Sequence, residues 1–123
     1  MIQKKKHIIN ILKQKNYTIL YKMPTITIKP SNKKNKKYDA FIYYNNAQKR
    51  PKVVSFGAKG YDDYVGTESS ATNKQREAYL SRHDKEKDQT FDTAGALSYY
   101  ILWGKSRSIR ENIKSFKKRY NLK

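Results

Sequence analysis

The amino-acid sequence predicts a small α+β domain in which a three-stranded antiparallel β-meander precedes three short α-helices. The first half contains three short segments rich in β-branched and aromatic residues, separated by polar turns. The second half changes to helical periodicity, with apolar side chains recurring at three- and four-residue spacing. The length of 123 residues suits one domain with a modest core, since hydrophobic residues make up 37% of the chain.

Each of the three expected strands has its own sequence signal. Thr25–Ile28 alternates polar and apolar side chains with period two, and Pro30 ends it because proline cannot donate to a sheet ladder. Tyr38–Tyr44 is rich in aromatic and β-branched residues, which favour strands. Lys52–Phe56 is the third expected strand. Such short consecutive strands are typical of a meander.

The connections between these strands are polar. Ser31–Lys37 is a lysine-rich loop, and Asn45–Pro51 has the composition of a turn. Gly57 and Gly60 predict a tight turn with backbone angles that other residues rarely adopt.

Two helices are predicted between the sheet and the last segment. Asn73 to about Glu86 is the first, and a polar stretch follows it. Its expected inner stripe consists of Arg76, Tyr79, Leu80 and His83. The second helix is expected to start after an N-cap at Asp92 or Thr93 and to run to Trp103. Gly104 stands where a C-terminal glycine cap belongs.

The last segment predicts an amphipathic helix. Ser108 and Glu111 have the spacing of a capping box. An apolar stripe recurs at Ile109, Ile113, Phe116 and Tyr120. A basic stripe lies on another face of the same helix.

Positive charge dominates the composition, with 28 Lys and Arg against 10 Asp and Glu and a net charge of +18. Residues 1–37 contain eleven Lys and no acid, residues 38–104 are balanced, and residues 105–123 contain eight basic residues and one acid. A neutral body with basic ends is typical of proteins that hold a polyanion. Solubility through net charge is the alternative. We favour binding, because self-repulsion at this charge needs a compensating use.

Residues 1–24 are expected to form a basic N-terminal segment, and residues 25–123 a single small domain. Two interpretations of the segment stay open. Its scattered Ile and Leu residues permit an imperfect amphipathic helix; alternatively, Met23 is the true initiator and the preceding residues are not native. Polar residues interrupt the apolar residues of this segment, so it does not predict a secretory signal. No apolar stretch of the chain is long enough to span a bilayer.

The sequence offers little chemistry for catalysis, and we expect no enzyme, no metal and no cofactor. The chain has no cysteine, so disulfides and thiolate metal sites are excluded. His83–Asp84 lacks the further ligands that a metal-dependent phosphohydrolase needs. A nuclease built on Asp62 or Asp63 with Lys59 is a weak alternative, because aspartates in turns usually bond to their own backbone.

Several short motifs follow one another from Lys52 onward. They are Val53–Tyr64 (VVSFGAKGYDDY), Arg76, Tyr79–His83 (YLSRH), Thr93–Gly95 with Ser98, Leu102–Lys105 (LWGK) and Ser108–Ile109. In this order and spacing, the chain resembles a family of small basic proteins of nucleocytoplasmic large DNA viruses, found in giant viruses and iridovirus-like relatives. The resemblance implies a viral protein located in the virion or in the viral factory of the host cytoplasm. It implies no catalytic residue. Gly104 departs from the pattern, which has a longer polar residue there.

The expected function is largely sequence-independent binding of nucleic acid, with duplex DNA favoured. Lysines near the sheet form the first expected group of binding residues: Lys33, Lys34, Lys36 and Lys37 as a mobile arm, with Lys59 nearby. A basic helical face forms the second: Arg107, Arg110, Lys114, Lys117, Lys118 and Arg119. The alternative is a minor capsid or internal virion protein that binds acidic proteins or membrane surfaces; either way, other virion proteins are candidate partners.

Aromatic residues are unusually frequent, with eleven Tyr and one Trp. Aromatic rings among basic residues can stack on unpaired bases. The competing interpretation is that these tyrosines fill the core and keep their hydroxyls wet. We favour the core interpretation, and therefore prefer contacts with the duplex backbone to stacking on single strands.

Overall fold

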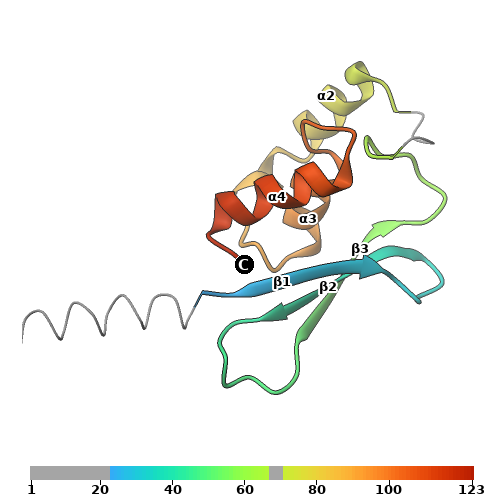
Figure 1. Ribbon diagram of the computed structural model, residues 1–123. Helices are drawn as coiled ribbons and strands as arrows, with labels where there is room; N and C mark the ends of the chain where they lie inside the picture. Colours follow the sequence, from blue (N-terminus) through green and yellow to red (C-terminus); the bar gives the residue numbers. More distant parts are fainter. Residues whose placement is uncertain (1–22, 67–70) are drawn as a thin grey trace, which may run out of the picture.

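The computed structural model describes residues 23–66 and 71–123, so the basic N-terminal segment predicted at residues 1–24 lies almost wholly outside the described residues. Within this part, the predicted α+β fold is confirmed: a three-stranded antiparallel sheet in the order β1-β2-β3 is followed by three α-helices (Figure 1). The elements are β1 (Thr25–Pro30), β2 (Lys36–Tyr43), β3 (Lys52–Ala58), α2 (Asn73–Arg82), α3 (Ala94–Leu97) and α4 (Ile109–Tyr120).

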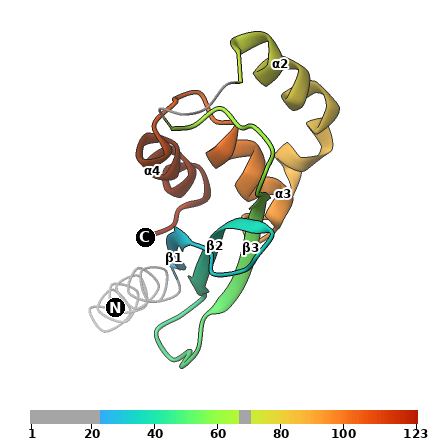
Figure 2. The same ribbon diagram turned by 90° about the vertical axis from the view of Figure 1, so that its right-hand side faces the viewer.

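The sheet has one face turned toward the helices. Ile26 pairs with Ile42, and Tyr38 pairs with Phe56, so their side chains share this face. Figures 1 and 2 show α2, α3 and α4 on the same side of the sheet. Burial follows from this arrangement, because Ile26, Ile42 and Phe56 are at most 2% exposed, whereas Val53 on the other face is 45% exposed.

The helices complete a single core. Leu97 of α3 lies in one buried cluster with Ile101 and Leu102 of the π-helical turn η2 (Ser98–Leu102) and with Phe116 of α4. The same cluster contains the inward residues of the sheet. In residues 23–66 and 71–123, no helix combines the length and the apolar character that a bilayer span requires.

Helix α2 ends earlier than the sequence predicts, at Arg82 instead of about Glu86. His83 is its C-cap, and the chain continues as the 3₁₀ turn η1 (Asp84–Asp88). Gly95 leaves room for the 3₁₀ turn that follows α2. A side chain there would come within 3.0 Å of Glu86, so its absence lets η1 pack closely against the start of α3. A longer α2 would not bring Glu86 to this position.

The predicted N-caps are present at two helices. The Thr93 hydroxyl accepts a hydrogen bond from the backbone of Ala96, and the Ser108 hydroxyl accepts one from the backbone of Glu111. The complete capping box is found on α2 instead, between Thr72 and Gln75, and it was not predicted.

Gly104 is required for space and not as a left-handed helix cap. The residues with positive φ among the described glycines are Gly57, Gly60 and Gly66, so the prediction for the Gly57 turn is correct and that for Gly104 is wrong. Gly104 is buried, and a Cβ atom there would collide with the carbonyl oxygen of Tyr100 and the amide of Asn112.

Asn112 occupies the space that Gly104 leaves. It is 3% exposed. Its side-chain nitrogen donates to the carbonyl oxygens of Ile101 (2.9 Å) and Ser106 (2.7 Å), and its side-chain oxygen accepts from the Ser106 N–H (3.0 Å). One buried amide therefore satisfies three backbone groups in the connection between η2 and α4.

The C-terminal residues after α4 form backbone hydrogen bonds with the start of the sheet. The backbone N–H of Ile26 donates to the carbonyl of Lys123 (2.9 Å), and the N–H of Lys123 donates to the carbonyl of Pro24 (2.8 Å). Asn121, in the left-handed conformation, ends α4 and turns the chain toward β1. Figure 1 shows the C-terminus beside the start of β1.

Replacing Asn112 by alanine is expected to lower the free energy of unfolding by about 2 to 4 kcal/mol, because buried carbonyl groups lose their donor. Ser115→Ala, an exposed position on the same helix, is the control and should change stability by less than about 0.5 kcal/mol. Urea unfolding followed by circular dichroism measures both. Equal stability of the two variants would show that the amide does not hold the connection.

Asp92 makes stability depend on pH. Hydrogen bonds from Thr90 and Tyr44 (both 2.6 Å), together with the charge of Lys52, lower the pKa of Asp92 from 3.8 to about 2. A lowered folded-state pKa means that this stabilisation is complete above the unfolded pKa and is lost as the pH falls toward 2. We expect Asp92 to contribute about 2 kcal/mol above pH 5.

The Asp92→Asn variant tests this pH dependence. Its stability deficit relative to the natural chain should be largest above pH 5 and should shrink as the pH falls to 2. Urea unfolding over this pH range measures the difference, with the exposed Asp88→Asn as control. A deficit that stays constant with pH would rule out the carboxylate as its source.

Candidate nucleic-acid interface

The first predicted group of lysines lies at one end of the sheet. The backbone N–H of Lys59 donates to the carbonyl of Asn35 (3.1 Å), and the Lys59 ammonium donates to the carbonyl of Lys33 (3.2 Å). These bonds bring the connection between β1 and β2 against the segment that follows β3. We define the sheet-end cluster as the exposed residues Lys33, Lys34, Lys36 and Lys59.

The arm prediction is wrong in two respects. Lys36 and Lys37 belong to strand β2 and not to a loop, because the chain already pairs with β3 at Lys36. The remaining residues form a turn closed by hydrogen bonds, in which the Ser31 N–H donates to the carbonyl of Lys37 and the Ser31 hydroxyl accepts from the Lys33 N–H. The sheet-end cluster is therefore carried by a hairpin.

Lys37 has a different environment from its neighbours. Its ammonium donates to a carboxylate oxygen of Asp63 at 2.6 Å and to the carbonyl of Tyr61 at 2.5 Å. Asp63 is only 8% exposed, so it depends on this and other partners inside the protein. Lys37 thus holds the segment after β3 and is not available to a polyanion as predicted.

The second group lies on α4. We define the α4 stripe as Arg110, Lys114, Lys117 and Lys118, which share one face of the helix by their spacing. The opposite face is buried through Asn112 and Phe116. Within residues 23–66 and 71–123, no member of the α4 stripe has a carboxylate within ion-pair distance. The stripe therefore presents uncompensated positive charge.

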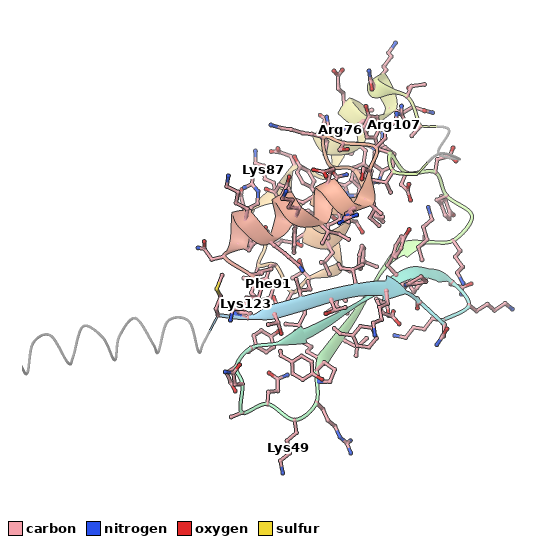
Figure 3. All side chains as sticks on the ribbon, viewed as in Figure 1. Lys49, Arg76, Lys87, Phe91, Arg107 and Lys123 are labelled. Atoms are coloured by element: carbon pink, nitrogen blue, oxygen red, sulfur yellow. The ribbon has the colours of Figure 1, made fainter. Side chains whose placement is uncertain are left out.

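Two predicted binding residues on this segment are held by aromatic rings. The Arg107 guanidinium lies 4.1 Å from the centre of the Tyr64 ring and donates to the carbonyl of Ala71 at 2.8 Å. Arg76 faces the same ring at 5.5 Å, and Figure 3 shows the two arginines beside each other. Arg119 lies 4.3 Å from the centre of the Tyr100 ring. Arg107 therefore has a structural role first.

A groove between α2 and α4 was not predicted. It has a volume of about 670 Å³, and residues of η2 also line it. Its aromatic residues, among them Tyr99 and Trp103, were identified in the sequence only as rings near basic residues. Arg76 and Lys105 also line it and were not predicted as binding residues. The sequence does contain a signal for this groove: Tyr99 and Trp103 are four residues apart, and a basic residue, Lys105, follows two positions after Trp103.

The candidate catalytic residues Asp62, Asp63 and His83 line one cavity of about 730 Å³, together with Glu86. The Nδ1 atom of His83 lies 3.0 Å from a carboxylate oxygen of Glu86, and its ring stacks on Tyr79 with the ring centres 4.1 Å apart. Burial, and then the charge of Glu86, raises the pKa of Tyr79 to about 12, so its hydroxyl stays protonated at neutral pH. Among the residues that the structure describes, no three His, Asp or Glu side chains group as metal ligands do.

The sheet and α2 resemble a known protein family. Residues 26–83 match the model of a family of unknown function, DUF5754. The match runs from β1 through α2 to its C-cap, so α3 and α4 lie beyond it. No curated protein and no solved structure matches the chain. The chain is therefore similar to this family over the sheet and α2.

The two adjacent lysines of β2 are expected to respond differently to mutation. Lys37→Ala leaves Asp63 without its ammonium partner and should destabilise the fold by about 1 to 3 kcal/mol. Lys36→Ala removes an exposed charge and should leave stability within about 0.5 kcal/mol while weakening binding to duplex DNA. Thermal unfolding and a gel-shift titration separate the two effects. The distinction between the two lysines fails if both variants behave alike.

Proposed function

We propose that this protein is a non-enzymatic nucleic-acid-binding protein that holds duplex DNA through its phosphates. The observation that carries the proposal is the set of basic side chains on the sheet-end cluster and the α4 stripe, none of which forms an ion pair with a carboxylate in the described part of the chain. A surface of this kind attracts polyanions and binds them with release of condensed counterions.

The distribution of ion pairs supports this proposal. In residues 23–66 and 71–123, the lysines paired with a carboxylate are Lys37, Lys52 and Lys87. Of these three, only Lys37 was predicted to bind nucleic acid. The direct ion pairs of the described residues thus lie mostly outside the two basic surfaces, although, after a hydrogen bond from Ser55, the charge of Lys33 helps to lower the pKa of Asp39. A protein whose charge served solubility alone would have no reason to separate its charges in this way.

The contacts that these residues can make favour the phosphate backbone over base edges. Lysine presents a compact point charge, which fits a phosphate but does not distinguish one base pair from another. Arg110 is the exposed guanidinium of the α4 stripe. We therefore propose binding with little sequence preference. The resemblance to small basic viral proteins supports viral DNA as the ligand and the virion or viral factory as the place.

Binding to duplex DNA is expected to depend steeply on salt. With about six phosphate contacts, the logarithm of the association constant should fall against the logarithm of the salt concentration with a slope near −5. Fluorescence anisotropy of a labelled random duplex over a series of salt concentrations measures it. A slope near zero would contradict the proposal.

Two triple variants distinguish the effect of where the positive charges lie from the effect of net charge on DNA binding. Alanine at Arg110, Lys114 and Lys118 should bring the slope to about −2 to −3, since each lost phosphate contact removes about 0.9. Alanine at Lys49, Arg50 and Lys85 removes the same net charge from other exposed positions and should leave the slope nearly unchanged. Figure 3 shows Lys49 at the tip of the connection between β2 and β3. Equal effects of both variants would show that only net charge matters.

A further inference from the structure

The groove between α2 and α4 combines two kinds of side chain that rarely share one hollow without acids. Tyr99, Tyr100 and Trp103 supply aromatic surface, and Arg76, Lys105, Lys118 and Arg119 supply positive charge. The residues that line it include no Asp or Glu. A ligand that fits this chemistry has a flat ring and a negative charge close to it.

The aromatic part of the groove is held firmly. Trp103 stacks on Tyr79 with the ring centres 4.3 Å apart and the planes only 8° from parallel. Tyr99 meets Tyr100 edge to face, with the ring centres 4.9 Å apart. Both contacts fix ring orientation before any ligand arrives, which lowers the entropy lost on binding.

The backbone below these rings has an uncommon form. Ser98–Leu102 is a turn of π-helix, and such turns occur often at functional sites. Gly104 follows and has no room for a side chain. Arg76 is fixed over this turn, because its Nε donates to the carbonyls of Trp103 (3.1 Å) and Gly104 (2.9 Å). The same guanidinium faces the ring of Tyr64, 5.5 Å from the ring centre, so its position is fixed from two sides.

We propose that this groove binds an unpaired nucleobase together with its phosphate, so that the protein holds single-stranded segments as well as duplex DNA. The base stacks on the aromatic residues, and the basic residues around them contact the phosphate. The inference rests on the proposed function in one respect, since Lys118 belongs both to this groove and to the α4 stripe. A paired base cannot enter, because both of its faces are covered in the duplex.

Trp103 provides a direct test, since it is the only tryptophan in the chain. The probes are short oligo(dT) and an oligonucleotide of the same length whose sites are abasic, which has the phosphates without the bases. We expect oligo(dT) to quench the fluorescence of Trp103 and to bind about tenfold more tightly than the abasic strand. A blunt duplex should bind without comparable quenching.

Variants of Tyr99 locate the effect. Tyr99→Ala should remove most of the preference for oligo(dT) over the abasic strand, whereas Tyr99→Phe should keep it. Tyr61→Ala is the matched control, because Tyr61 is 74% exposed and lies outside this groove. Circular dichroism confirms folding of each variant, and the comparison of the two strands on the natural protein stands even where a variant fails to fold.

The outcomes separate this inference from the proposed function. Equal affinity for oligo(dT) and the abasic strand, without quenching, overturns base binding in the groove but does not contradict duplex binding. Quenching and preference for oligo(dT) without any affinity for duplex support the groove and overturn duplex binding. Failure to bind all three probes overturns both.

Discussion

The side-chain amide of Asn112 is the interaction on which the placement of the basic surface depends. It bonds the backbone of Ile101 and Ser106 from the buried side of α4, and it fits only because Gly104 has no side chain. A buried amide with three partners tolerates little rotation of the helix that carries it. The outward face of α4, with Arg110 and Lys114, is therefore fixed toward solvent. The hydrogen bonds of Lys123 with β1 fix the other end of the same helix.

Charge in this fold is divided by position and not spread evenly. Asp63 and Asp92 pair with Lys37 and Lys52, and these pairs join the sheet to the segments that follow it. Lys36, next to Lys37 in the sequence, has no such partner in the described residues. Lys36 and Lys37 therefore differ in their contacts, because successive side chains of a strand point to opposite faces of the sheet.

Local pattern was enough to predict the strands and the amphipathic last helix, since their periodicity is determined by neighbours along the chain. It was not enough for contacts between distant residues. In the sequence, Lys37 cannot be distinguished from the other lysines near it. Its role depends on a hydrogen bond to Asp63, which is 26 residues away. Arg107 is held by Tyr64 in the same way. The 3₁₀ turn after α2 packs in the space left at Gly95, and the helix propensities of neighbouring residues do not predict such a contact.

The tyrosines have different environments in the fold. Tyr44 and Tyr79 are half-buried, and burial, followed by Asp92 for Tyr44 and by Glu86 for Tyr79, raises the pKa of each to about 12. Tyr99 instead lines the groove with cations from α2, from α4 and from the connection before α4. α4 contributes Lys118 to this groove and Arg110 and Lys114 to the stripe beside it. Under the proposed function, a strand bound along the stripe would therefore reach the aromatic rings. Backbone binding and base stacking would then be successive contacts along one helix.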